Sequence, residues 1–136
     1  FINTSKDFQV VSKRKPNNNE FSALELGWKL VKFVKSNAII FNAEDRLLGV
    51  GAGQMSRIDS VKIAIRKSKE NGLNLNDSFM ASDAFFPFSD SIELAASEGV
   101  IGIIQPGGSV KDEEIIKVVD DLNLIMILTK ERHFYH

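Results

Sequence analysis

Residues 82–90 hold the combination of side chains best suited to binding a ligand. The segment reads Ser-Asp-Ala-Phe-Phe-Pro-Phe-Ser-Asp, with three phenylalanines around a proline and an acid on each side. Burying a phenylalanine side chain is worth roughly 1.5–3 kcal/mol, so such rings normally belong to a core. In a segment that contains proline they suggest instead a rigid apolar wall for a flat ligand, which polar groups at the edge would orient.

Residues 49–57 form a glycine-rich segment between a predicted strand and a predicted helix. The sequence is Gly-Val-Gly-Ala-Gly-Gln-Met-Ser-Arg, and glycine lets backbone N–H groups approach a ligand. The spacing is not that of a dinucleotide fingerprint, because its sixth position is Gln54 rather than glycine. A tight turn therefore stays an open alternative. Ser56 and Arg57 begin the helix, where the helix dipole favours an anion.

Two more segments follow predicted strands. Residues 105–109 (Gln-Pro-Gly-Gly-Ser) come after an apolar run, and ligands bind at the carboxyl ends of strands in α/β sheets. A plain connection between strand and helix is the alternative. Residues 132–136 (Arg-His-Phe-Tyr-His) hold two aromatic residues and two histidines, which is unusual for a disordered tail. The histidines lack metal-ligand partners at helical spacing, and a partly ordered tail is the alternative.

Asp83 and Asp90 raise the alternative of a paired-carboxylate acid–base site, as in glycosidases. The sequence gives no distance between the two carboxylates. Both positions also suit helix or turn caps, and we favour caps over catalysis.

Composition excludes several classes of protein. The 136 residues suit one domain, with 43% hydrophobic and 26% charged residues. A net charge of −1 gives no basic face for nucleic acid, and no apolar run approaches the length of a membrane span. The absence of cysteine excludes a disulfide framework and a thiolate metal site. No signal peptide is visible, and a start at Phe1 rather than Met suggests a fragment or a processed chain.

The hydrophobic pattern predicts an α/β fold. Helical spacing indicates helices over residues 20–35, 57–70 and 89–98, and Ser109 with Asp112 resembles a capping box that opens a helix to Leu122. Strands are predicted at residues 8–12, 37–41, 47–51, 79–81, 100–104 and 124–128. The alternation in the second half implies parallel strands with helices on both sheet faces. We expect a three-layer α/β/α sandwich with a mixed sheet, a hairpin at one side and Trp28 in the core.

Six segments, in order, resemble the AICAR transformylase family, the formyl-transferring half of a bifunctional purine-synthesis enzyme that also carries IMP cyclohydrolase. The segments are residues 11–16, 35–38, 51–57, 82–88, 105–109 and 132–136, and the likeness runs from about Phe8 to His136. The family's fold is similar to that of cytidine deaminases and occurs twice in the transformylase. The resemblance implies a C-terminal fragment, with an N-terminal strand and linker over 1–19 and the second deaminase-like copy over 20–136.

This resemblance also implies a reaction. The family transfers a formyl group from 10-formyltetrahydrofolate, as co-substrate, to the 5-amino group of AICAR in purine biosynthesis. It needs no metal, and a chain without cysteine has no ligand set for the zinc of deaminases. The implied partners are the two small molecules and a second subunit in a homodimer, with no nucleic acid and no membrane. The implied location is cytoplasmic.

Matching positions imply two groups of binding residues. The nucleotide side consists of Asn37, Arg57, Phe85, Arg132 and Phe134. The folate side consists of Ile58, Pro87, Phe88, Asp90, Ser109 and Val110. His136 matches a terminal histidine to which we give a supporting role, while Ser89 stands where many members have arginine.

The family's adjacent Lys-His pair, assigned to proton transfer, has no match in these residues. We therefore expect the chain alone to be catalytically inactive. A non-catalytic nucleotide-binding module and a domain that serves only in assembly remain alternatives.

Overall fold

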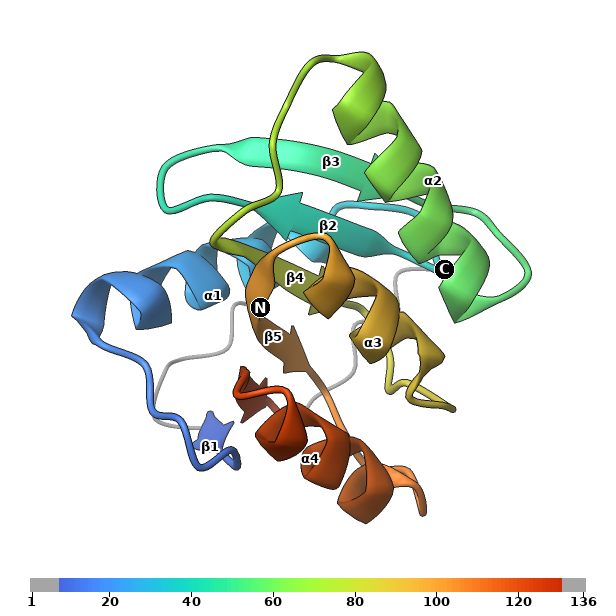
Figure 1. Cartoon of the computed structure of the whole chain (residues 1–136). Coiled ribbons are helices and arrows are strands. Elements are labelled where there is room, and N and C mark those ends of the chain that lie inside the picture. Colours follow the sequence, from blue (N-terminus) through green and yellow to red (C-terminus); the bar gives the residue numbers. More distant parts are fainter. Residues whose placement is uncertain (1–7, 131–136) are drawn as a thin grey trace.

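The structure is a computed structural model that describes residues 8–130 (Figure 1). Its elements are, in order, β1 (Gln9–Val10), α1 (Asn18–Val31), β2 (Ile39–Asn42), β3 (Leu47–Gly51), α2 (Arg57–Glu70), β4 (Ser78–Ser82), α3 (Asp90–Ser97), β5 (Val100–Gln105), α4 (Asp112–Asp121) and β6 (Ile125–Leu128). Within the described part of the chain, no helix is long and apolar enough to cross a membrane.

The six strands form one mixed sheet in the order β1-β6-β5-β4-β2-β3. Strands β4, β5 and β6 are parallel, whereas β2 runs antiparallel to both β3 and β4. Strand β3 therefore points the same way as β4. As a result, the carboxyl ends of β3, β4, β5 and β6 and the beginning of β2 all meet at one edge of the sheet, here called the carboxyl edge.

Helices cover both faces of the sheet, which confirms the predicted three-layer sandwich. Helix α1 packs on one face with Trp28, which is 1% exposed and lies in the core as predicted. Helices α2, α3 and α4 pack together on the other face. The uneven distribution has a physical reason: two successive right-handed crossovers, β4-α3-β5 and β5-α4-β6, advance in the same direction and so place both helices on the same side.

Helix α1 begins two residues before the predicted start and ends four residues before the predicted end. The side chain of Asn17 accepts a hydrogen bond from the Glu20 backbone, and the Glu20 carboxylate accepts one from the Asn17 backbone. This is a capping box built on asparagine, which sequence analysis placed inside a linker. The spacing of Asn17 and Glu20, three positions apart, could have revealed this helix start from the sequence.

Helix α4 begins at Asp112 and its N-cap is Lys111, so the predicted N-cap at Ser109 was two residues early. The carboxylate half of the predicted capping box forms, since Asp112 accepts a hydrogen bond from the Ser109 backbone. The hydroxyl half does not, because Ser109 Oγ accepts from the Lys111 backbone instead of from Asp112. Ser109 thus closes a short turn with Lys111, and the helix begins only after that turn.

Two glycines of β3 allow α2 to pack closely on the sheet. A Cβ atom at Gly49 would lie 2.7 Å from the Ala64 carbonyl oxygen, and one at Gly51 would collide with the Ser60 carbonyl. Glycine therefore serves helix–strand packing here. This contact brings the first turn of α2 next to the start of β2, where the candidate site lies.

Candidate functional site

All predicted site residues that the structure describes lie on the loops and helix starts of the carboxyl edge. These residues are Asn37, Arg57, Ile58, Phe85, Pro87, Phe88, Asp90, Ser109 and Val110. Arg132, Phe134 and His136 fall outside the described residues. The chain nevertheless leaves β6 at this same edge, because the Thr129 backbone donates a hydrogen bond to the carbonyl of Gln105, the last residue of β5.

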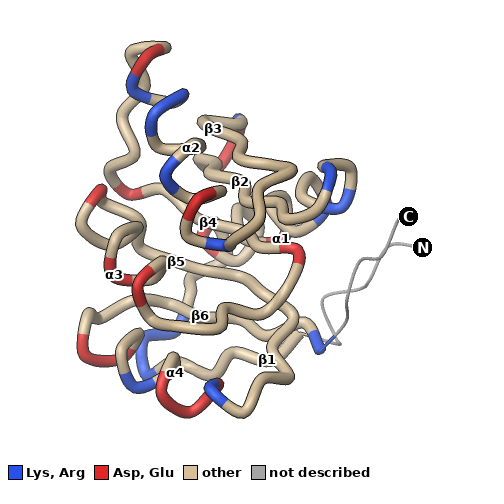
Figure 2. Tube along the Cα trace, turned by 90° about the vertical axis from the view of Figure 1, so that its right-hand side faces the viewer, with Lys and Arg blue, Asp and Glu red and all other residues tan. Residues whose placement is uncertain are grey.

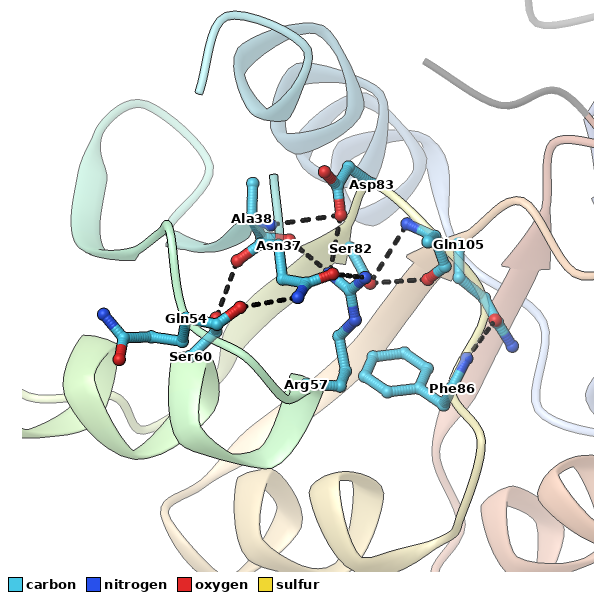
Figure 3. A network of polar contacts seen from close by, with 10 residues as sticks. Asn37, Ala38, Gln54, Arg57, Ser60, Ser82, Asp83, Phe86 and Gln105 are labelled. Carbon is cyan, nitrogen blue, oxygen red and sulfur yellow. Dashed lines mark hydrogen bonds and ion pairs between the residues drawn. The ribbon is translucent and has the colours of Figure 1, made fainter. Parts of the chain in front are cut away.

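Arg57 and Asp83 form a buried ion pair at the centre of this edge (Figure 3). Arg57 is the first residue of α2, and Asp83 follows the last residue of β4. Arg57 Nη1 donates to Asp83 Oδ1 across 2.6 Å, and the two side chains are only 7% and 6% exposed. The Arg57 guanidinium thus meets a carboxylate of the protein itself, where sequence analysis expected an anionic ligand group.

Asn37 joins this pair to the neighbouring loop. Its Oδ1 accepts from Arg57 Nη2 at 2.9 Å, and its Nδ2 donates to the Gln54 carbonyl at 2.6 Å. The Asn37 carbonyl in turn accepts from Ser60 Oγ at 2.6 Å. The structure therefore brings together Asn37 and Arg57, two of the residues predicted for nucleotide binding.

The phenylalanine segment divides between core and surface. Phe86 is fully buried, and its backbone N–H donates to Gln105 Oε1 at 3.2 Å. Phe85 is half-buried, whereas Phe88 is 64% exposed. Of the three rings, Phe85 and Phe88 thus have exposed surface for the apolar wall that the sequence suggested, and Phe86 anchors the segment.

Gln105 is a residue that sequence reasoning did not assign. It ends β5, is 1% exposed, and its amide also contacts Met126 Sδ at 3.5 Å. The signal was a polar side chain that directly follows a continuous apolar strand, since buried polar groups normally have hydrogen-bond partners.

The first residue of α4, Asp112, stabilises the turn after β5. The Asp112 carboxylate accepts from the backbone N–H groups of Gly108, at 2.8 Å, and Ser109, at 3.3 Å. Gly107 and Gly108 both adopt positive φ angles, 74° and 96°. Two backbone N–H groups that could have received a ligand, those of Gly108 and Ser109, are thus occupied from within the turn, while Val110 is 98% exposed.

Asp83 and Asp90 have different surroundings, which weakens the glycosidase alternative. Asp83 Oδ1 accepts hydrogen bonds from Arg57 and from the Ala38 backbone. Asp90 is an exposed first residue of α3 and accepts from the Ser91 backbone. One carboxylate is fixed in an ion pair and the other sits at a helix start.

A cavity of 630 Å³ opens at the opposite edge of the sheet. Its lining includes Arg14, Asn76, Asp77, Glu93, Leu122 and Asn123. Arg14 is already engaged there, with hydrogen bonding to the Asn123 carbonyl and an ion pair with Glu20. We place the candidate site at the carboxyl edge because ligands of open α/β sheets bind beyond the carboxyl ends of the strands.

The distribution of charged and metal-ligating side chains bears on which ligands the described residues can bind. Basic and acidic residues are interspersed over the helices and loops, and the strands carry few of them (Figure 2). Among residues 8–130, no group of three or more His, Cys, Asp or Glu side chains could hold a metal ion. The polar groups assembled here can donate and accept hydrogen bonds around a ligand.

The fold belongs to a known class. A solved diaminohydroxyphosphoribosylaminopyrimidine deaminase/5-amino-6-(5-phosphoribosylamino)uracil reductase from Thermotoga maritima superimposes with a TM-score of 0.51, over 79% of this chain and 34% of that one. The sequence identity is 14%, so the likeness concerns the fold alone. The predicted α/β/α sandwich of the cytidine deaminase-like kind is confirmed.

Sequence comparisons find relatives of one kind. Residues 2–67 match the family model of the AICARFT/IMPCHase bienzyme. The chain is also 50% identical over 132 residues to the bifunctional purine biosynthesis protein PurH of Chloroflexus aurantiacus, and 50% identical over 135 residues to PurH of Chlorobium phaeobacteroides. These matches cover 97% and 99% of this chain, which is therefore similar over nearly its whole length to one part of the bifunctional PurH proteins. It spans about a quarter (26%) of the length of either relative.

Proposed function

We propose that this chain supplies part of the substrate-binding surface of an AICAR formyltransferase, which transfers a formyl group from 10-formyltetrahydrofolate to AICAR. The observation that carries the proposal is the direct hydrogen bond between Asn37 and Arg57 at the carboxyl edge. These two residues are 20 positions apart in the sequence, and both match family positions for the nucleotide. The relatives' role in purine biosynthesis agrees with such a substrate.

On the nucleotide side, Asn37, Arg57 and Phe85 would receive AICAR. The ion pair with Asp83 neutralises the Arg57 guanidinium. We therefore favour a carbonyl oxygen of the ligand, rather than its phosphate, as the acceptor for Arg57. The half-buried ring of Phe85 would lie against the flat base, and Arg132 and Phe134 would complete this side.

On the folate side, the chain offers apolar surface with one acid. Phe88 and Val110 are 64% and 98% exposed and can cover a pterin ring, together with the half-buried Ile58 and the exposed Pro87. Asp90 is exposed at the start of α3, where its carboxylate can accept from the donor groups of a pterin. Ser109 would add a polar contact.

In the proposed reaction, the 5-amino group of AICAR attacks the formyl carbon. A tetrahedral intermediate with a developing oxyanion forms, and the bond from the formyl carbon to the folate nitrogen then breaks. The amine loses one proton and the folate nitrogen gains one, so the site needs groups that move protons. We propose that the residues of this chain mainly position the two substrates, which by itself accounts for a large share of catalysis.

Calorimetric titration of the full-length protein with AICAR tests the proposal. We expect Arg57→Ala to raise the dissociation constant about 10- to 100-fold, since hydrogen bonds to charged groups contribute roughly 1.5–3 kcal/mol. The matched control is Arg66→Ala, which removes an exposed arginine from the same helix and should leave the affinity unchanged.

Binding of tetrahydrofolate distinguishes the proposed function from its alternatives. A formyltransferase requires that tetrahydrofolate binds and that Phe88→Ala weakens its binding. A protein that binds AICAR but no folate would be a nucleotide-binding module. No binding of either compound by a folded protein would contradict the proposal and favour a role in assembly.

A further inference from the structure

Asp83 occupies the junction of three segments that are distant in the sequence. It directly follows β4 and is 6% exposed. Its Oδ1 accepts from Arg57 Nη1 at 2.6 Å and from the Ala38 backbone N–H at 3.1 Å. Its own backbone N–H donates to the Ala38 carbonyl at 3.2 Å, and Arg57 Nη1 donates to that same carbonyl, also at 3.2 Å. One aspartate thus links the end of β4, the start of α2 and the residue that precedes β2.

These contacts leave Arg57 little freedom. Its guanidinium meets Asp83 and the Ala38 carbonyl through one nitrogen and Asn37 through the other. A planar guanidinium held from both nitrogens has a defined orientation. Removing the carboxylate would leave a buried, unpaired positive charge, which is unfavourable and would drive the side chain toward solvent.

We infer that Asp83 is the positioning residue of the site, which orients Arg57 and, through it, Asn37 for the ligand. The choice of AICAR as that ligand rests on the proposed function. Asp83 itself acts only through these neighbours. A buried ion pair is weak evidence of a stability role, because apolar replacements often stabilise a fold as well or better. Orientation of a binding group accounts for its presence more directly.

A double-mutant cycle in the full-length protein tests this role. The dissociation constant for AICAR is measured for the parent protein, for Asp83→Asn, for Arg57→Ala and for the double variant. We expect Asp83→Asn to weaken binding about tenfold or more, and to have almost no further effect once Arg57 is absent, because groups that act as a unit are not additive. Glu98→Gln is the matched control, since it converts the carboxylate of another ion pair, Lys69–Glu98, to an amide and should change nothing.

Two results would overturn the inference. One is unchanged AICAR binding by Asp83→Asn. The other is a loss that adds in full to that of Arg57→Ala, which would mean that Asp83 acts independently of Arg57. Should Asp83→Asn fail to fold, Asp83→Glu decides, because it keeps the charge but moves the carboxylate by one methylene group. We expect folded Asp83→Glu to bind AICAR more weakly, and parent-like affinity would refute a positioning role.

Hydrogen exchange keeps this test separate from that of the proposed function. If the unsubstituted protein does not bind AICAR, the proposed function fails, while the arrangement around Arg57 can still be measured. The Ala38 amide donates directly to Asp83, so its exchange should be faster in Asp83→Asn than in the parent and unaffected in Glu98→Gln. Equal exchange in parent and Asp83→Asn would show that Asp83 does not order this segment.

Discussion

At the scale of single residues, Arg57 shows how a side chain proposed to bind a ligand is held by other groups of the protein. An arginine at the first position of a helix lies where the helix dipole favours negative charge. In the structure the guanidinium of this arginine pairs with the carboxylate of Asp83, 26 residues away in the sequence. What Arg57 offers a ligand is therefore an oriented hydrogen-bond donor rather than a free positive charge.

Gly51 is a second residue on which the site depends. We expect Gly51→Ala to destabilise the protein by about 1–3 kcal/mol, the usual cost of overpacking, because the new methyl group would meet the backbone carbonyl of Ser60. Ser60 also bonds to Asn37, so AICAR binding should weaken as well. Urea denaturation and AICAR titration measure the two effects. The control is Met55→Ala at a 99% exposed position, which should change stability by less than about 0.5 kcal/mol. Equal denaturation midpoints for Gly51→Ala and Met55→Ala would contradict this account.

At the scale of elements, the contribution of α1 to stability depends on the hydrogen bonds of its first turn. We expect Asn17→Ala to cost about 0.5–2 kcal/mol of stability, because it removes the acceptor for the Glu20 backbone N–H. Asn19→Ala, two residues further on in the first turn and exposed, is the control and should be neutral or slightly stabilising, since alanine is the better helix former. Thermal unfolding of both variants measures the difference. A larger loss from Asn19→Ala than from Asn17→Ala would show that the capping box is not what starts the helix.

The turn between β5 and α4 shows the limit of motif reasoning at this scale. Ser109 and Asp112 have the spacing of a capping box, and one of its two hydrogen bonds does form. The positive φ angles of Gly107 and Gly108 redirect the chain so that the helix starts later. Spacing alone could not distinguish these two outcomes, because both satisfy the same backbone groups.

At the scale of the whole molecule, the carboxyl edge stands out by its exposed apolar side chains. Phe33, Met55, Phe88 and Val110 are each between 64% and 99% exposed, and all four lie on loops at this edge. Phe88 and Val110 belong to the proposed folate side. Apolar side chains gathered around one edge are typical of a surface that binds something.

We expect the 136-residue chain, purified by itself, to form no formylated product from AICAR and 10-formyltetrahydrofolate. The physical reason is that positioning alone leaves the proton transfers uncatalysed, and the adjacent Lys-His pair implied for that step has no match in this sequence. An absorbance assay of folate turnover, with the full-length protein as the positive control, measures the result. A turnover rate equal to that of the full-length protein would show that these residues are sufficient.

Much of this molecule was determined by the sequence alone. The alternation of apolar and polar residues predicted the strands, the helices and the layered fold, and short motifs indicated the loops of the candidate site. These features depend on neighbours within a few positions of one another. The capping box at Asn17 was equally local and could have been found.

Only the tertiary structure decided which groups meet. Strand register places Ser82 opposite Ile39, and this pairing brings Asp83 to Ala38 and Arg57. Sequence spacing could not predict that Asp83 lies at the candidate site or that Phe86 is core. Each of these contacts depends on the packing of strands and helices across the sheet, and no local pattern in the chain encodes the distance between such groups.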